Sequence, residues 1–495
     1  RPLSLTTLGK QHTSLRKIRN PRNRSSEIAN HQLQMLFFSK LLGSQVFSLS
    51  QDLLKWIAES SRNSRVEGES ISLHVANVAS EGTASVRISP ENLLGRHCAI
   101  LGTTGGGKSW TVSRILEEVS NFRAKAILLD ATGEFRSFKK NTVHLHIGAG
   151  GADTRDSNEV TLPYTNLTEN DLFAIFRPSG QTQAPKLRAA IKSLKLLKIE
   201  KSLDSGDGVI TKAGTNKSLY ETKYKKHSKT IDLPSADFEI GSLSRQINEE
   251  CVWPIGGTQR DPDPALWGNY NESERSYCVS LMNRIEDILT SPELACIFKW
   301  GKLPSLIDEL EKFLKNDTSS VLRICLRDLP FSHSAREIVA NAIGRYLLAQ
   351  GRKSRFAELP LVIFLDEAHQ FLDKSLGDEN NRFPLDAFEL IAKEGRKYSL
   401  CICLSTQRPR DIPEAVLSQM GTFVVHRLIN ARDREIVEKA SGDIDRPVTV
   451  FLPTLAPGEA VIIGAEFLMP LTVQILQPTF VPESFGPAFQ KYWAK

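Results

Sequence analysis

The chain has 495 residues, of which 40% are apolar and 24% charged, and its formal net charge is +6. These are the proportions of a globular protein of about three domains, and they exclude a collagen-like or intrinsically disordered chain. No apolar run approaches the ~18–20 residues of a membrane helix, and seven cysteines without a Cys-x-x-Cys pair favour a reducing, cytoplasmic setting over a disulfide framework or a zinc ribbon.

Residues 1–65 are basic and weakly patterned, with short helices expected at His31–Leu42 and Leu49–Ser60. Their net charge is +8, residues 186–229 carry another +8, and the rest of the chain sums to −10. Such clusters attract a phosphate backbone, although solvated faces and disordered tails have the same composition. The start at Arg1 rather than Met is compatible with a missing upstream piece.

Alternating apolar residues after Ser70 predict a strand, and a second strand is expected at Ala84–Ile88, together the end of a small β domain. From His97 apolar runs alternate with amphipathic helices, which is typical of a mainly parallel sheet covered by helices. The expected strands are Cys98–Leu101, Ala126–Asp130, Val321–Leu326, Leu361–Asp366, Leu400–Ser405 and Thr422–Arg427. The expected helices are Lys108–Val119, Ser334–Gln350, Leu385–Arg396, Pro413–Gln419 and Ala431–Ala440. Glu459–Gly464 and Leu468–Leu476 are expected to form a closing hairpin.

A glycine-rich segment follows the first strand of this alternation. Gly102-Thr103-Thr104-Gly105-Gly106-Gly107-Lys108-Ser109 matches the P-loop pattern G-x-x-x-x-G-K-[ST], and Trp110 continues into the helix. The glycines let backbone N–H groups approach phosphates, Lys108 neutralises phosphate oxygens, and Ser109 offers a hydroxyl to Mg²⁺. A plain glycine-rich turn explains three glycines before Lys-Ser poorly. Residues 102–110 therefore predict a nucleotide site.

The run Leu361–Leu365 ends in Asp366 and Glu367, the pattern of a Walker B strand. Asp366 is expected to hold Mg²⁺ and Glu367 to polarise the attacking water. A buried strand that ends in acids by chance is the weaker alternative beside a P-loop. Because another strand, Val321–Leu326, lies between the two motifs along the chain, we expect an ATPase of the P-loop division that carries its own catalytic glutamate.

Ligands of open α/β folds bind beyond the C-terminal ends of the strands. Gln407 follows Leu400–Ser405 and is expected to act near the γ-phosphate as a sensor. Arg396, at the end of a helix, is expected to reach the γ-phosphate of a neighbouring subunit, where an arginine stabilises transition-state charge; a helix-dipole role is the alternative. The competing arginines are Arg408, Arg427 and Arg432.

Asp130 and Glu134 close the second strand of the alternation at the same edge of the sheet. Two interpretations stay open. The pair either positions metal or water indirectly, or builds a structural turn with a capped helix start.

Taken together, these motifs resemble those of the HerA/FtsK group of hexameric DNA-translocating ATPases, and HerA more than FtsK. The matching segments are Leu94–His97, Leu101–Ser109, Asp130–Phe135, Asp366–His369, Glu394–Tyr398, Ser405–Pro409 and Ala456–Ala460. Ala131 stands where the family favours proline, and the family's N-terminal β-barrel is barely visible. The resemblance implies a homohexamer with ATP and Mg²⁺ between subunits, duplex DNA in its pore, a trans arginine at Arg396, and a docked nuclease or NADase-type effector.

The expected fold is α/β, with a RecA-like P-loop ATPase core, helices on both sheet faces, a helical insertion and a small or incomplete N-terminal β region. We divide the chain into a basic region with a partial barrel (1–90), two parts of the core (91–135 and 320–480), the insertion (136–319) and a tail (481–495).

We expect a DNA translocase or helicase working in DNA end processing or antiviral defence. Its DNA contacts would include Lys192, Lys195 and Lys198, which recur on one face of a predicted helix. The alternative is an ATP-gated ring scaffold that assembles and regulates a partner effector. A conjugative coupling-type pump is a weaker option, because such pumps normally carry membrane helices.

Overall fold

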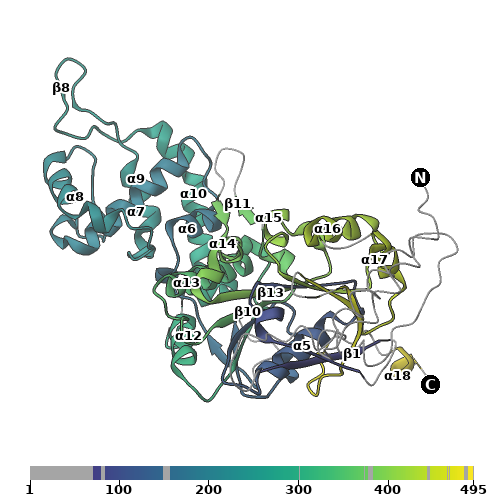
Figure 1. Ribbon diagram of the computed structural model, residues 1–495. Coiled ribbons are helices and arrows are strands. Elements are labelled where there is room, and N and C mark those ends of the chain that lie inside the picture. Colours follow the sequence, from purple (N-terminus) through teal and green to yellow (C-terminus); the bar gives the residue numbers. More distant parts are fainter. Residues whose placement is uncertain are drawn as a thin grey trace, which may run out of the picture.

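The computed structural model describes residues 71–79, 84–148, 156–299, 301–372, 374–376, 383–442, 446–464, 467, 469–483 and 489–493. The predicted helices upstream of residue 65 and the basic cluster 1–65 lie outside them. The described residues form one large sheet with helices on both faces and a projecting helical region (Figure 1).

Eight strands of this sheet are parallel to one another. In spatial order they are β14 (Thr422–His426), β3 (Cys98–Leu101), β13 (Leu400–Thr406), β10 (Leu361–Leu365), β4 (Lys125–Asp130), β9 (Val321–Cys325), β5 (Thr142–Ile147) and β6 (Asn158–Val160). Four antiparallel strands continue the sheet beyond β14, in the order β15 (Glu459–Gly464), β16 (Leu471–Ile475), β1 (Leu73–Val78) and β2 (Ser85–Ile88). The predicted α/β fold with a mainly parallel sheet and a closing hairpin is therefore confirmed.

The two faces of the sheet bury two separate hydrophobic cores, because successive strand side chains point to opposite faces. In β4, Ile127 and Leu129 join the core packed by α13 (Ala335–Arg352) and α14 (Ala387–Glu394). Ala126 and Leu128 join the core packed by α5 (Lys108–Val119) and by β1 and β2. A strand covered on both faces reads as a continuous apolar run, which is why these central strands were predictable.

Two expectations about domain limits differ from this architecture. Residues 71–88 do not close a separate β domain, because β1 pairs with β16 through Ala76 and Ile475 and so extends the main sheet. The region 136–319 is not wholly a helical insertion, since β5 and β6 continue the parallel core beside β9. The sequence Thr-Val-His-Leu-His-Ile of β5 alternates polar and apolar residues, unlike the apolar runs of the central strands; its first three residues are partly buried and its last three are buried.

The helical region lies between β6 and β9. Its main helices are α6 (Glu169–Phe176), α7 (Gln183–Ile199), α8 (Lys217–Ile231), α9 (Leu243–Glu250), α10 (Glu272–Thr290) and α12 (Leu306–Lys315). Helices α7 to α10 project away from the sheet, with the short strand β8 (Pro262–Asp263) at the tip (Figure 1).

The lysines of α7 are each paired with an acid, so the structure gives no support to the predicted free basic face. Lys195 is buried and its ammonium lies 2.6 Å from the Glu169 carboxylate. Lys192 pairs with Asp232 at 2.7 Å, and Lys198 pairs with Asp237. The spacing of three residues does place them on one side of the helix, but that side packs against the acids of neighbouring segments.

Within the described ranges, no helix is both long and apolar enough to cross a membrane. All seven cysteines are free thiols, as expected.

Candidate functional site

The parallel sheet brings three predicted motifs to one edge. The P-loop follows β3, Gln407 follows β13, and Asp366 and Glu367 follow β10, so all three leave the C-terminal ends of neighbouring strands. The strand between β3 and β10 in space is β13, through the pairs Thr406–Leu101 and Leu365–Leu404. The strand that separates the motifs along the chain, β9, lies instead beyond β4.

The P-loop is held in place by close backbone packing. Gly107 has φ +114°, a conformation that residues with a Cβ rarely adopt, and a Cβ there would lie 3.1 Å from Gly458 Cα. A Cβ on Gly102 would lie 2.6 Å from the Cβ of His426. The Thr103 amide donates to the Arg427 carbonyl at 2.9 Å. These contacts fix the loop, which continues directly into α5. The N-terminal N–H groups of this helix are suited to bind phosphate.

Lys108 and Ser109 begin α5 at the centre of the site, and Trp110 lies half-buried beside them. Lys108 is 7% exposed, and its ammonium donates to the Thr103 carbonyl at 3.1 Å. Burial lowers the pKa of Lys108, an effect that the nearby Glu367 and Asp366 carboxylates oppose. The Ser109 hydroxyl donates to Glu134 at 2.9 Å.

Three carboxylates crowd together opposite Lys108. Burial, and then the neighbouring Asp130, Glu367 and Glu134, raise the pKa of Asp366 well above its usual value. Burial likewise raises the pKa of Glu134, although the Ser109 hydrogen bond opposes this. Mutual repulsion of this kind is relieved by a divalent cation, for which carboxylate and hydroxyl oxygens are the preferred ligands.

Asp130 takes a structural role. Its carboxylate accepts hydrogen bonds from the amides of Gly133 at 2.7 Å and Phe135 at 3.1 Å, and from Arg323 Nε at 2.7 Å. These three hydrogen bonds hold the carboxylate inside the strand-to-turn junction. Of the two open interpretations, Asp130 fits the structural turn, although its charge acts on Asp366, and Glu134 contacts Ser109 in the P-loop.

Gln407 contacts the P-loop directly. Its side-chain oxygen accepts a hydrogen bond of 2.5 Å from the Thr104 hydroxyl. Of the competing arginines, Arg408 lies at the same edge and is exposed, within 3.7 Å of Asp411.

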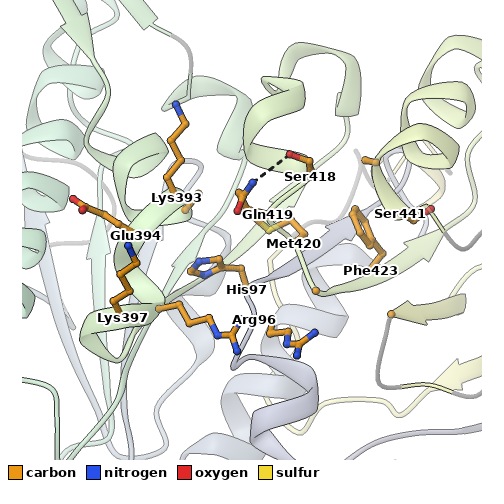
Figure 2. Close-up of a pocket in the computed structure, with 15 residues that line it drawn as sticks. Arg96, His97, Lys393, Glu394, Lys397, Ser418, Gln419, Met420, Phe423 and Ser441 are labelled. Atoms are coloured by element: carbon orange, nitrogen blue, oxygen red, sulfur yellow. Dashed lines mark hydrogen bonds between the residues drawn. The ribbon is translucent and has the colours of Figure 1, made fainter.

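Arg396 lies at the other edge of the sheet. It precedes β13, whose far end carries Gln407, and a seven-residue strand is about 23 Å long. Arg396 therefore cannot reach the P-loop of its own chain. It lines a cavity of about 590 Å³ together with Arg96, Lys393 and Lys397. Figure 2 shows Arg96 and the two lysines bordering this cavity from separate segments, with Gln419 and Met420 across from them.

Two histidines of the site, the buried His426 and the partly buried His369, had no role predicted from the sequence. His426 is fully buried under the P-loop, with Nε2 at 2.8 Å from the Thr111 hydroxyl and Nδ1 at 2.8 Å from the Glu459 carbonyl. His369 lies between Glu367 and Thr406. A lone histidine at a strand end gives no sequence signal, whereas His369 is part of the Asp-Glu-Ala-His segment that follows the Walker B strand.

These residues fit ATP and Mg²⁺. The P-loop offers backbone N–H groups, Lys108 offers a cation, and the crowded carboxylates with Ser109 offer hard oxygen ligands. No other group needs to be assumed to explain the donor set.

Comparison with protein families gives two matches. Residues 73–252 match the model described as "Helicase HerA, central domain", and residues 357–462 match "Helicase HerA-like C-terminal". Both descriptions name HerA, and together the matched residues include the P-loop, Asp366, Glu367, Arg396 and Gln407.

Several curated proteins are similar at low identity. A probable helicase of Methanocaldococcus jannaschii is 22% identical, over 81% of this chain and 66% of its own length. The DNA double-strand break repair helicase HerA of Pyrococcus furiosus is 23% identical, over 88% of this chain and 73% of its own. The chain thus spans just under two thirds of the first of these relatives.

Among solved structures, the bacterial conjugative coupling protein TrwB, in a trigonal form with sulphate, has a similar fold. Its TM-score is 0.51 at 14% identity, over 90% of this chain and 99% of the other.

Proposed function

The chain is a P-loop ATPase of the HerA/FtsK type, and we propose that it hydrolyses ATP as a homohexameric ring to move along duplex DNA. The observation that carries the proposal is the separation of Arg396 from the P-loop on opposite edges of one sheet. A complete site then needs the Arg396 edge of one subunit against the P-loop edge of the next. Such a head-to-tail contact closes into a ring when its rotation permits.

In this proposal each residue has one task. The P-loop amides and Lys108 bind the β- and γ-phosphates, while Ser109 and Asp366 hold Mg²⁺. Bound MgATP supplies the γ-phosphoryl group and a divalent positive charge. Glu367 accepts a proton from the attacking water. Gln407 contacts the γ-phosphate as a sensor.

Arg396 acts from the neighbouring subunit, where it stabilises the charge that develops in the transition state. Arg96 and Lys397 line the same cavity and support this role because their charge attracts an anionic phosphate chain, whereas Lys393 is paired with Glu389.

DNA as the substrate rests on the relatives, two of whose names describe helicases. The paired lysines of α7 do not contribute to this argument. The test is ATP hydrolysis with and without duplex DNA, beside Lys108→Ala, which we expect to lose nucleotide binding. Hydrolysis stimulated several-fold by DNA is expected. Lys108-dependent hydrolysis that DNA leaves unchanged contradicts the translocase proposal.

One observation favours the scaffold alternative. Trp253 and Ile255 lie on the projecting helical region and are 54% and 53% exposed, as a surface for a protein partner would be. An effector of nuclease or NADase type, acting in DNA end processing or antiviral defence within the cytoplasm, stays a prediction. Effector activity that needs the intact ring but no DNA-stimulated hydrolysis would favour the scaffold.

A further inference from the structure

The backbone of Glu367 is unusual. Its φ is +49°, in the left-handed region that costs a residue with a side chain of order 1 kcal/mol or more. This conformation starts the short turn Ala368–Gln370 and brings His369 back beside the Glu367 carboxylate. Strain of this kind persists only where the surroundings enforce it, so the position of Glu367 is set by its neighbours.

The Glu367 carboxylate has one oxygen that is buried and lacks a hydrogen bond. This atom, Oε2, lies 3.2 Å from His369 Nδ1, which is within reach but not aligned as a hydrogen bond. A buried acceptor without a partner costs about 1–3 kcal/mol, and more when it is charged. A small rotation of the imidazole toward Oε2 would remove this cost.

The same nitrogen of His369 is engaged elsewhere. Nδ1 lies 3.1 Å from the hydroxyl of Thr406, with hydrogen-bond geometry. A ring nitrogen carries one hydrogen or one lone pair, so it makes one well-aligned hydrogen bond at a time. Thr406 and Glu367 therefore compete for Nδ1.

Thr406 belongs to the tip of β13, which contacts the nucleotide site. Its hydroxyl accepts a hydrogen bond from the Arg408 amide at 3.0 Å, and the adjacent Gln407 accepts one from Thr104 in the P-loop. Thr406 is therefore next in sequence to a residue that contacts the P-loop, and its hydroxyl is tied to the residue after that one.

We propose that His369 is a positioning residue that transmits the state of the β13 tip to Glu367. When Thr406 holds Nδ1, Glu367 lacks a fixed partner and turnover is slow. When the tip shifts and releases Nδ1, His369 donates to Oε2 and fixes the carboxylate, leaving its other oxygen to accept the proton of water. This inference rests on the proposed ATPase activity and adds the device that regulates it.

The test compares four variants with the wild-type protein. His369→Phe removes the donor and keeps a planar ring, and we expect kcat to fall at least about tenfold with KM for ATP unchanged within about twofold. His369→Asn places an amide N–H near the position of Nδ1, and we expect it to restore most of the loss. A packing role alone would not be rescued by a smaller polar side chain.

Thr406→Val is expected to change turnover in the opposite direction to His369→Phe. It removes the competing hydroxyl at nearly constant shape, so we expect DNA-independent turnover to rise and the stimulation by DNA to fall, while Thr406→Ser resembles the wild-type protein. In the double variant His369→Phe, Thr406→Val, the threonine change is expected to have no effect on kcat, because its target is gone.

The outcomes separate the two proposals. If the wild-type protein hydrolyses no more ATP than Lys108→Ala, the proposed function fails and the relay fails with it. If the wild-type protein is active but His369→Phe keeps its kcat, or Thr406→Val lowers basal turnover as much as His369→Phe does, the relay alone is overturned. The comparison of Thr406→Val with Thr406→Ser decides the question even if His369→Phe does not fold.

Discussion

Arg323 and Asp130 form a buried ion pair between the neighbouring strands β9 and β4, with 2.7 Å between Nε and Oδ2 and side-chain exposures of 1% and 0%. The pair fixes the turn that carries Glu134 to Ser109, since the same carboxylate accepts the amides of Gly133 and Phe135. This buried charge pair therefore links two central strands to the turn that carries Glu134.

Arg323→Met is expected to destabilise the protein strongly, because it leaves the Asp130 charge buried without its cation. Loss of one partner of a buried pair costs about 3–5 kcal/mol. Thermal unfolding without nucleotide measures the effect. The matched control is Arg123→Met, which removes an exposed pair with Asp317, side chains 77% and 71% exposed, and is expected to change stability by less than about 1 kcal/mol. Equal midpoints for the two variants would contradict the structural role of Asp130.

Glu367→Gln is expected to bind ATP and fail to hydrolyse it, with a rate lower by about 100-fold or more, because the amide cannot accept the proton of water. Binding of a fluorescent ATP analogue and phosphate release measure the two steps separately. Glu414→Gln, at an exposed position of the short helix Glu414–Leu417, serves as control and should keep the wild-type rate. Turnover by Glu367→Gln near the wild-type rate would remove Glu367 from the catalytic role.

Arg396→Ala is expected to abolish hydrolysis in the neighbouring subunit rather than in its own. Mixtures with Glu367→Gln test this, because a contact between one chain's wild-type Arg396 and another chain's wild-type Glu367 restores activity. Lys397→Ala, which alters the same cavity, is the control and should reduce activity less. Two inactive variants that never complement each other at any mixing ratio argue against action in trans.

Stability is expected to fall as the pH drops from about 6.5 to about 4. Burial lowers the pKa of His97 and of His426 to about 4 each. The unfolded chain binds these protons near pH 6.5, whereas the folded protein binds them only near pH 4, so protons favour the unfolded state across this window and the loss is complete below it. Each histidine contributes roughly 3 kcal/mol at most.

Thermal midpoints at pH 7.5 and pH 5 measure this loss. His426→Gln should lower the midpoint at pH 7.5 but flatten its dependence on pH. A slope that survives in His426→Gln and in His97→Gln would assign the acid sensitivity to other groups.

The sequence predicted the parts of this molecule whose chemistry is local. A P-loop must have its glycines and Lys108 in consecutive order, and β10 must be apolar throughout because both faces are covered. Contacts between distant segments left no such pattern: the approach of His426 to Gly102 depends on two strands being neighbours. The lysines of α7 were misjudged because a helical period gives the face of a side chain but not what packs on that face.

The edge of the sheet was unpredictable for a similar reason. β1 pairs with β16, almost 400 residues away along the chain, and neither strand shows its partner in its own residues. Strand β5 was not predicted although polar and apolar residues alternate along Thr142–Ile147, and it lies inside the sheet, between β9 and β6.

The C-terminal hairpin has a mechanical consequence. The Gly458 amide donates to the Gly106 carbonyl of the P-loop at 3.1 Å, just before β15 begins. From there a continuous ladder runs through β15 and β16 to β1. Hydrogen bonds thus connect β1 through β16 and β15 to the P-loop. A displacement of β1 would therefore be transmitted through these strands to the nucleotide site.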